Sequence, residues 1–206
     1  MTDLKPRRDR NMDAKRARIC GAAATLLAEH GYAGVTTQAV SDAADVAAGT
    51  LFRYAATKAD LLLMVYNDEF AQAIEAGRAA AAEHDDLPGA VFAMVLPVLT
   101  RGAEQPENAI LYQRELLFGQ GRMLHRAEGL RLVADLEESI GCLLLRAVGR
   151  EDEIARIHAQ RASRVVFASL HLALAQSSTG AHPDKAPAQE LRAQVALVVR
   201  GFLDSI

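Results

Sequence analysis

A short stretch near the N-terminus carries side chains suited to contact with nucleic acid. Thr50, Arg53 and Tyr54 lie three and four residues apart, so a helix would place them on one face. Arg53 can pair bidentately with guanine or neutralise a phosphate, and Thr50 offers a hydroxyl and a methyl group. Thr57 is expected to cap another helix, and Lys58 follows at the start of that helix, where backbone N–H groups already favour an anion. The predicted chemistry is non-covalent recognition of phosphates and base edges.

Two short helices joined by a tight turn are expected to position these side chains within residues 35–58. Thr36 can cap the first helix with its hydroxyl, and Asp45 tolerates the left-handed conformation where that helix ends. The second helix, about 47–54, would be roughly 12 Å long, comparable to the width of a major groove. This pattern predicts a helix-turn-helix, although any pair of short antiparallel helices produces a similar pattern.

The composition favours an all-α fold. The chain has 206 residues, of which 50% are hydrophobic and only 5% aromatic, with no Trp. Apolar residues recur at helical spacing, and no segment alternates like a strand. The predicted helices number nine, with approximate bounds 11–31, 36–44, 47–54, 57–82, 87–101, 105–118, 123–148, 151–177 and 187–205.

The distribution of charge and the positions of turn-forming residues divide the chain into three parts. We expect a disordered basic tail over 1–10, a helix-turn-helix domain over 11–56 and a larger helical domain over 57–206. Formal net charge is −3, yet residues 1–60 hold nine basic and seven acidic side chains. A basic N-terminal part on an acidic body fits an approach to phosphate. A solvated charged tail would explain the same distribution.

Several function classes lack their residue patterns. Cys20 and Cys142 lie far apart in helical segments, which suggests small core residues and a reducing cytoplasm. The six histidines have no metal-ligand spacing, so neither a metal nor a cofactor is expected. No nucleophile lies beside a base and no paired acids occur at a defined spacing, so we expect no enzyme. No apolar run approaches the length of a membrane span.

Three sequence motifs, GYAGVTTQAV, AGTLFRY and TKADLL, occur in this order within residues 16–62. This segment resembles the TetR family of bacterial transcriptional regulators. The resemblance implies that Leu51 anchors the recognition helix inward. It also implies a set of residues that contact DNA: Thr36, Thr37, Gln38, Ala47, Ala48, Gly49, Thr50, Phe52, Arg53, Tyr54 and Lys58.

Four positions depart from the family's pattern. Asp45 stands where Gly is usual, which implies a strained turn and an acid near DNA. Ala47 replaces a Ser-like cap, Phe52 replaces a Tyr whose hydroxyl could bond phosphate, and Ala55 replaces a packed Phe. Few groups therefore remain for direct base readout, so specificity would rest on few contacts together with DNA shape.

The larger domain is expected to bind a ligand and to dimerise, as the resemblance implies. Candidate pocket residues are Met94, Tyr112, Arg114, Glu115, Phe118, Met123, His125 and His171, although Arg114 and Glu115 could equally form a solvated face. The wide apolar stripes of the last two helices suggest a four-helix interface between two subunits. Candidate interface residues are Val165, Ser169, Leu191, Val195, Val198 and Phe202, and a buried role within one chain is the alternative.

The resulting hypothesis is a cytoplasmic, homodimeric transcriptional repressor. It would bind a palindromic double-stranded DNA operator and be released by a small-molecule effector of unknown identity. The long helix that begins at Thr57–Lys58 would act as the lever between the domains. One alternative is a helical enzyme or protein-interaction module in which the N-terminal helices are only structural. Another is a DNA-binding protein that responds to a partner protein.

Overall fold

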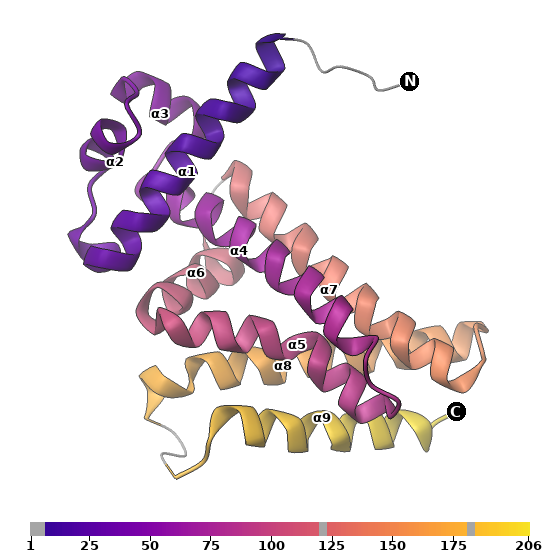
Figure 1. Cartoon of the computed structure of the whole chain (residues 1–206). Coiled ribbons are helices and arrows are strands. Elements are labelled where there is room, and N and C mark those ends of the chain that lie inside the picture. The colour runs from indigo at the N-terminus through magenta and orange to yellow at the C-terminus, as the bar shows by residue number, and fades with distance from the viewer. Residues whose placement is uncertain (1–6, 120–122, 181–183) are drawn as a thin grey trace.

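The computed structural model describes residues 7–119, 123–180 and 184–206. Within these ranges every regular element is a helix, which confirms the all-α prediction (Figure 1). The elements are α1 (Arg7–Gly34), α2 (Thr37–Ala43), α3 (Ala48–Tyr54), α4 (Lys58–Ala81), α5 (Leu87–Glu104), α6 (Pro106–Phe118), α7 (Leu124–Val148), α8 (Glu153–Thr179) and α9 (Pro187–Leu203). None of these helices is long and apolar enough to cross a membrane.

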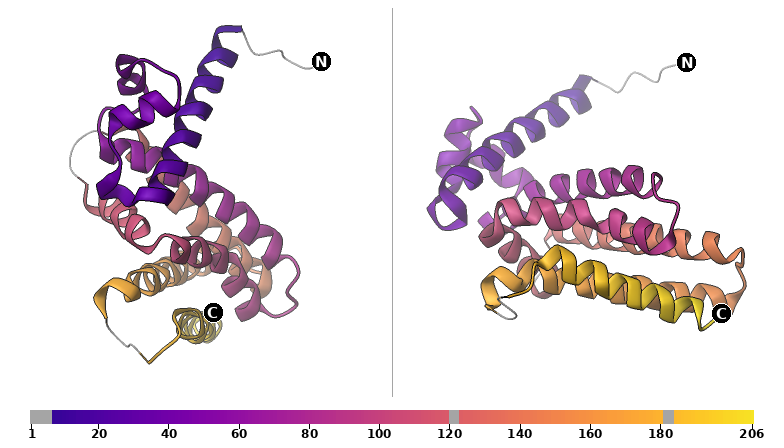
Figure 2. Two further views of the ribbon diagram at one scale, coloured as in Figure 1. Left: turned by 60° about the vertical axis from the view of Figure 1, so that its left-hand side comes forward. Right: turned by 60° about the horizontal axis from the view of Figure 1, so that its bottom comes forward.

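Helices α1 to α3 form a unit at one end of the molecule, next to the start of α4 (Figures 1 and 2). The capping prediction is confirmed, because Thr36 Oγ1 accepts a hydrogen bond from Ala39 N at 3.1 Å. Asp45 has φ 49°, the left-handed conformation expected at the turn before α3. A small apolar core holds the unit together, and Ile19, Val40 and Leu51 are fully buried in it.

The first helix is longer than predicted. It begins at Arg7, so residues 7–10 are helical and not the disordered segment that was expected there. The rest of that tail, residues 1–6, lies outside the described residues. Gly31 has φ 64° and interrupts the helix where the sequence predicted its end, and a short helical segment continues to Gly34. Three of the four residues at positions 7–10 are Arg, a good helix former, so the helix extends across a segment whose polarity suggested disorder.

Helices α4 to α9 form the body of the protein. Helix α4 packs against α5 and α7, and α8 packs against α7 and α9. Thr57 caps α4, since its Oγ1 accepts from Asp60 N at 3.0 Å as predicted. Gly77 lets α4 and α5 approach closely, because a Cβ there would overlap the backbone of Met94. Helices α8 and α9 lie side by side at the edge farthest from α1–α3 (Figure 2).

Candidate nucleic-acid interface and ligand pocket

Helix α3 has one buried and one exposed face. Leu51 is 0% exposed and packs into the core, in agreement with its expected role as the inward anchor. Gly49, Phe52 and Arg53 are exposed, and Thr50 is half-buried on the same side of the helix. The exposed face therefore presents one cation, one hydroxyl and an aromatic ring, beside backbone that Gly49 leaves uncovered.

Two of the predicted DNA-contacting side chains are engaged within the protein. The hydroxyl of Tyr54 donates to the carbonyl of Met12 in α1 at 3.2 Å. Lys58 Nζ lies 4.3 Å from the centroid of the Tyr32 ring and 3.4 Å from the Ala33 carbonyl oxygen, to which it donates. Both side chains are half-buried, so they hold α3 and α4 against α1 as well as bordering the exposed face.

The start of α2 and the turn complete this surface. Thr36, Gln38 and Ala47 are exposed, whereas Thr37 and Ala48 are half-buried. Ala47 is the N-cap of α3 and makes no side-chain capping bond, as its residue type predicted. The carboxylate of Asp45 is exposed and lies 3.6 Å from a guanidinium nitrogen of Arg18, so the acid in the turn has a cationic partner.

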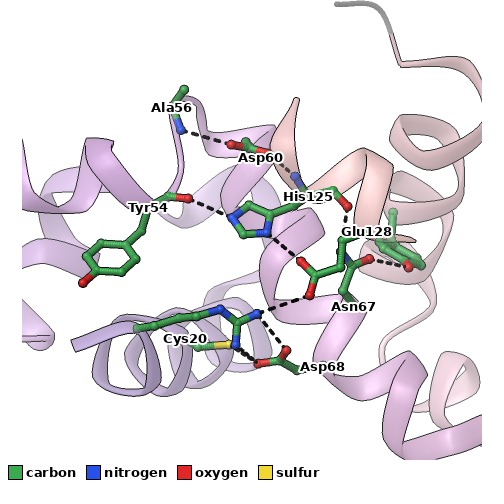
Figure 3. A network of polar contacts seen from close by, with 10 residues as sticks. Cys20, Tyr54, Ala56, Asp60, Asn67, Asp68, His125 and Glu128 are labelled. Atoms are coloured by element: carbon green, nitrogen blue, oxygen red, sulfur yellow. Dashed lines mark hydrogen bonds and ion pairs between the residues drawn. The ribbon is translucent and has the colours of Figure 1, made fainter. Parts of the chain in front are cut away.

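A buried histidine joins the end of α3 to the start of α7 (Figure 3). His125 Nε2 lies 2.8 Å from the carbonyl oxygen of Tyr54, and its Nδ1 lies 3.0 Å from a carboxylate oxygen of Glu128. Its backbone N–H donates to Asp60 Oδ1 at 3.3 Å, while Asp60 Oδ2 accepts from Ala56 N at 3.2 Å. His125 was predicted to line the ligand pocket. It lies instead at the junction between the two domains.

A second polar group ties α1 to α4 at the same junction. Arg16 forms a bidentate pair with Asp68 at 3.0 and 3.2 Å, and Cys20 Sγ donates to Asp68 Oδ2 at 3.2 Å. Burial and this bond raise the pKa of Cys20 to about 12, which leaves the thiol protonated and unreactive at neutral pH. Cys20 is thus a core residue as predicted. Cys142 is exposed, so its predicted burial was wrong.

An apolar pocket lies between α4, α5, α6 and α8. It encloses about 50 Å³. The ring of Tyr112 stacks on that of Tyr66 at a centroid distance of 5.7 Å and meets Phe70 edge-on at 6.5 Å. The lining residues are Tyr66, Glu69, Phe70, Ala73, Val98, Arg101, Gly102, Ala109, Tyr112, Gln113, Leu116, His171 and Leu174.

Two polar side chains of this pocket have buried atoms that find no hydrogen-bond partner among the described residues. They are Nε2 of Gln113 and both ring nitrogens of His171. Burial lowers the pKa of His171 to about 4, so the ring is neutral and offers one donor and one acceptor. Burial also raises the pKa of Glu69, against the opposing effect of nearby Arg101. Unsatisfied polar atoms in an apolar cavity are typical of sites that bind a ligand's polar group.

A second cavity of about 350 Å³ adjoins the first. Gly102 and Leu174 line both, and a Cβ at Gly102 would overlap the Leu174 side chain. Leu174 thus fills the space between the cavities. An apolar cavity that holds benzene measures about 150 Å³, so the first cavity alone is too small for a ligand of that size.

Most of the predicted pocket residues lie elsewhere. Of the predicted residues, Tyr112 and His171 line this cavity. Met94 is buried on α5 at a separate hollow beside α4 and α7, Arg114 is solvated, and Phe118 is 77% exposed. Glu115 and Met123 are half-buried outside the lining. The lining residues that sequence reasoning missed, such as Glu69, Arg101 and Gln113, come from three separate helices, and no local pattern links them.

Some of the predicted subunit-interface residues are buried within the chain, and others are partly exposed. Leu191, Val195 and Phe202 are buried against their own chain, so the inward alternative is correct for them. Val165 is 50% exposed, and Ser169 and Val198 are half-buried. Large apolar side chains that remain exposed on α8 and α9 are Ile154, Ile157, Val165, Leu172, Leu197 and Leu203. The stripes were wide because one side packs inward while the other remains uncovered.

Comparison with known proteins identifies the N-terminal unit. Residues 19–65 match the family model described as bacterial regulatory proteins, tetR family. This helix-turn-helix segment is therefore similar to the TetR family. Over 58 residues the chain is 41% identical to the HTH-type transcriptional repressor KstR of Mycobacterium tuberculosis, an alignment that covers 28% of this chain and 26% of KstR. The chain thus matches about a quarter of the length of this curated relative.

Solved structures extend the TetR-type likeness to the whole fold. FadR of Thermus thermophilus, a TetR-family repressor in complex with lauroyl-CoA, superposes with a TM-score of 0.68 at 22% identity, over 90% of this chain and 94% of that chain. FadR of Bacillus subtilis, in complex with stearoyl-CoA, gives 0.63 at 18% identity, over 90% and 98%. The two solved structures therefore share the fold of this chain over about 90% of its length.

Proposed function

We propose that this chain is a sequence-specific DNA-binding transcriptional repressor that acts as a homodimer in the cytoplasm. The observation that carries the proposal is the exposed face of α3, anchored by buried Leu51, in a segment that matches the TetR family. Residues 11–56 would form the DNA-binding domain and 57–206 the effector and dimerisation domain. The family match disfavours the alternative in which the N-terminal helices are only structural.

Arg53 is the residue of this face from which we expect direct readout. It is exposed and no hydrogen bond or ion pair of the described residues holds its guanidinium, so it can reach a base edge or phosphate. Thr50 and Phe52 would contact the backbone or thymine methyl groups, and Gln38 would approach a phosphate from α2. Specificity then rests on few base contacts together with DNA shape.

The uncovered apolar side chains on α8 and α9 support a dimer. Leu197 is 64% exposed and Val165 is 50% exposed. A two-fold interface over these helices would place two α3 helices for a palindromic operator with half-sites about one helical turn apart. The operator is therefore expected to be an inverted repeat.

The pocket supports regulation by a small molecule. Its apolar walls and the adjoining cavity suit an elongated apolar ligand, and Gln113 and His171 offer hydrogen bonds to a polar group. The two FadR relatives were solved with acyl-CoA molecules. We propose an effector with an extended apolar portion that enters by displacing Leu174, with lauroyl-CoA as the first compound to test.

Selection of duplexes from a random pool tests the DNA-binding proposal. The full chain should enrich an inverted repeat, and Arg53→Ala should bind the enriched duplex roughly 10- to 100-fold more weakly. Arg146→Ala is the matched control, because Arg146 is an exposed arginine on α7. No enrichment, or equal binding by the Arg53 variant, would refute the assignment of the α3 face.

A thermal-shift measurement tests the effector proposal. Lauroyl-CoA, and then uncharged compounds of similar apolar length, should raise the melting temperature and release the enriched duplex. Gly102→Leu would block the contact between the two cavities and should abolish the shift. A compound that raises the melting temperature equally in this variant binds elsewhere and would contradict the proposed site.

A further inference from the structure

A continuous series of hydrogen bonds leads from the pocket wall to the end of α3. The hydroxyl of Tyr112, whose ring lines the pocket, donates to Asn67 Oδ1 at 2.8 Å. Asn67 Nδ2 donates to the backbone carbonyl of His125 at 2.7 Å. The ring of the same histidine reaches the carbonyl oxygen of Tyr54 at 2.8 Å (Figure 3). Four residues from α6, α4, α7 and α3 are thereby linked in order.

The three side chains that form these bonds are buried. Asn67 is 1% exposed, and Tyr112 and His125 are also buried. Water therefore cannot readily replace a broken bond, and a buried polar group left unpaired is costly. Asn67 uses its carbonyl oxygen for one neighbour and its amide nitrogen for the other. A displacement of the Tyr112 hydroxyl must therefore be followed by Asn67 or leave an unpaired oxygen.

The far end of the series is a helix terminus. The last carbonyls of α3 have no partner within the helix, and His125 satisfies that of Tyr54. Because a carbonyl only accepts, Nε2 of His125 carries the hydrogen. Asp60 fixes the same junction from the other side, since its carboxylate accepts from both Ala56 N and His125 N. The N-terminus of α7 therefore sets where α3 ends.

Gly129 provides the space for the middle link. It lies one turn after His125 on α7, and a Cβ there would come within 2.7 Å of Asn67 Oδ1 and 3.4 Å of the Tyr112 hydroxyl. A side chain at this position would overlap Asn67 Oδ1 and the Leu116 side chain, and so would displace Asn67 from its bond with Tyr112. The backbone of α7 is thus close to both residues without blocking their bond.

We propose that Tyr112, Asn67 and His125 form a relay through which occupancy of the pocket changes the position of α3. A ligand in the pocket contacts the ring of Tyr112, and a displacement or tilt of the whole ring moves its hydroxyl relative to Asn67. His125 is a positioning residue, acting on DNA recognition only through α3. The relay deepens the proposed function and rests on it, and it requires that the ligand favour one arrangement of these bonds.

Hydrogen exchange of backbone amides tests the relay without DNA or effector. In Tyr112→Phe the series loses its first bond, and amides of residues 48–56 and 124–128 should exchange about three- to tenfold faster. The matched control is Tyr66→Phe, which removes from the neighbouring ring of the same pocket wall a hydroxyl whose hydrogen-bond partner, Asn108, lies outside the relay. This control should leave exchange in those two segments unchanged.

A second variant keeps the test decisive if loss of the hydroxyl has small effects. Gly129→Ala retains every relay residue but displaces Asn67, and should accelerate exchange in residues 48–56 as Tyr112→Phe does. The relay is overturned if both variants alter exchange only within α4 and α6, or if Tyr66→Phe affects α3 equally. Hydrogen exchange needs no operator, so the relay can be refuted while DNA binding is confirmed. DNA binding can likewise be refuted while the exchange result stands.

Discussion

The interior of the helix-turn-helix unit and its junction with the body of the protein are held together by different interactions. Helices α1–α3 enclose a small apolar core around Ile19, Val40 and Leu51, formed by residues close in sequence. The junction with the body is built from buried polar groups, among them Asp60, Asn67 and His125. Apolar packing tolerates small shifts, whereas hydrogen bonds between buried groups fix distance and direction. The contrast suggests that the apolar core of α1–α3 makes α3 rigid, whereas the polar junction with the body sets its position.

Removal of the apolar anchor should have the largest effect. Leu51→Ala creates a cavity at a fully buried site and should destabilise the N-terminal unit by about 2–5 kcal/mol. Urea unfolding followed by hydrogen exchange should detect early opening of residues 11–56 while α4–α9 remain protected. Leu130→Ala, at a 39% exposed position on α7, is the control. Equal protection of both units in the Leu51 variant would show that α3 is not anchored by this core.

Loss of the charge at the junction should weaken DNA binding less and without regard to sequence. Lys58→Ala removes a cation beside the α3 face and should lower affinity for enriched and scrambled duplexes by similar factors. If Lys58 neutralises one phosphate, the slope of log K against log salt concentration should become shallower by about 0.9 in the variant. A salt titration on both duplexes measures this. An unchanged slope would mean that Lys58 serves only to hold Tyr32 in α1.

The smallest expected effect is on the pH dependence of folding stability, and it comes from His171 in the pocket. Because the folded pKa of His171 is lowered to about 4, the unfolded chain binds a proton first as pH falls. Stability should thus be unaffected by this group above about pH 6.5 and should decline between about pH 6.5 and 4. Urea unfolding measures the free energy of unfolding at about pH 7.5 and about pH 5. The loss of stability between these two pH values should be about 1–2 kcal/mol smaller in His171→Leu than in the unmodified protein. His84→Leu, at an exposed position, is the control, and a parallel change in it would contradict burial as the cause.

The sequence predicted local features well. The caps Thr36 and Thr57, the left-handed Asp45, the uncapped Ala47 and the inward Leu51 all agree with the structure. Each depends on residues within about one turn of helix, where residue type largely determines conformation. The resemblance indicated the family of the N-terminal segment, because the three motifs that carry it lie in one continuous stretch of sequence.

Residues brought together from distant helices could not be predicted. Glu69, Gln113 and His171 line one pocket, yet nothing in their local sequence separates them from solvated polar residues. His125 was recognised only as a polar residue among apolar neighbours, a pattern compatible with a pocket or a junction. On α9, one helical stripe contains both fully buried Val195 and half-buried Val198, and only packing distinguishes them.

The most direct test of coupling between the two regions is a double-mutant cycle read by operator affinity. Tyr112→Phe and His125→Gln are measured singly and together on the enriched duplex, with Tyr66→Phe as the control. Each single change should weaken binding about three- to tenfold, and the double variant should bind no more weakly than the weaker-binding single variant. Effects that multiply in the double variant would contradict a shared route from the pocket to α3.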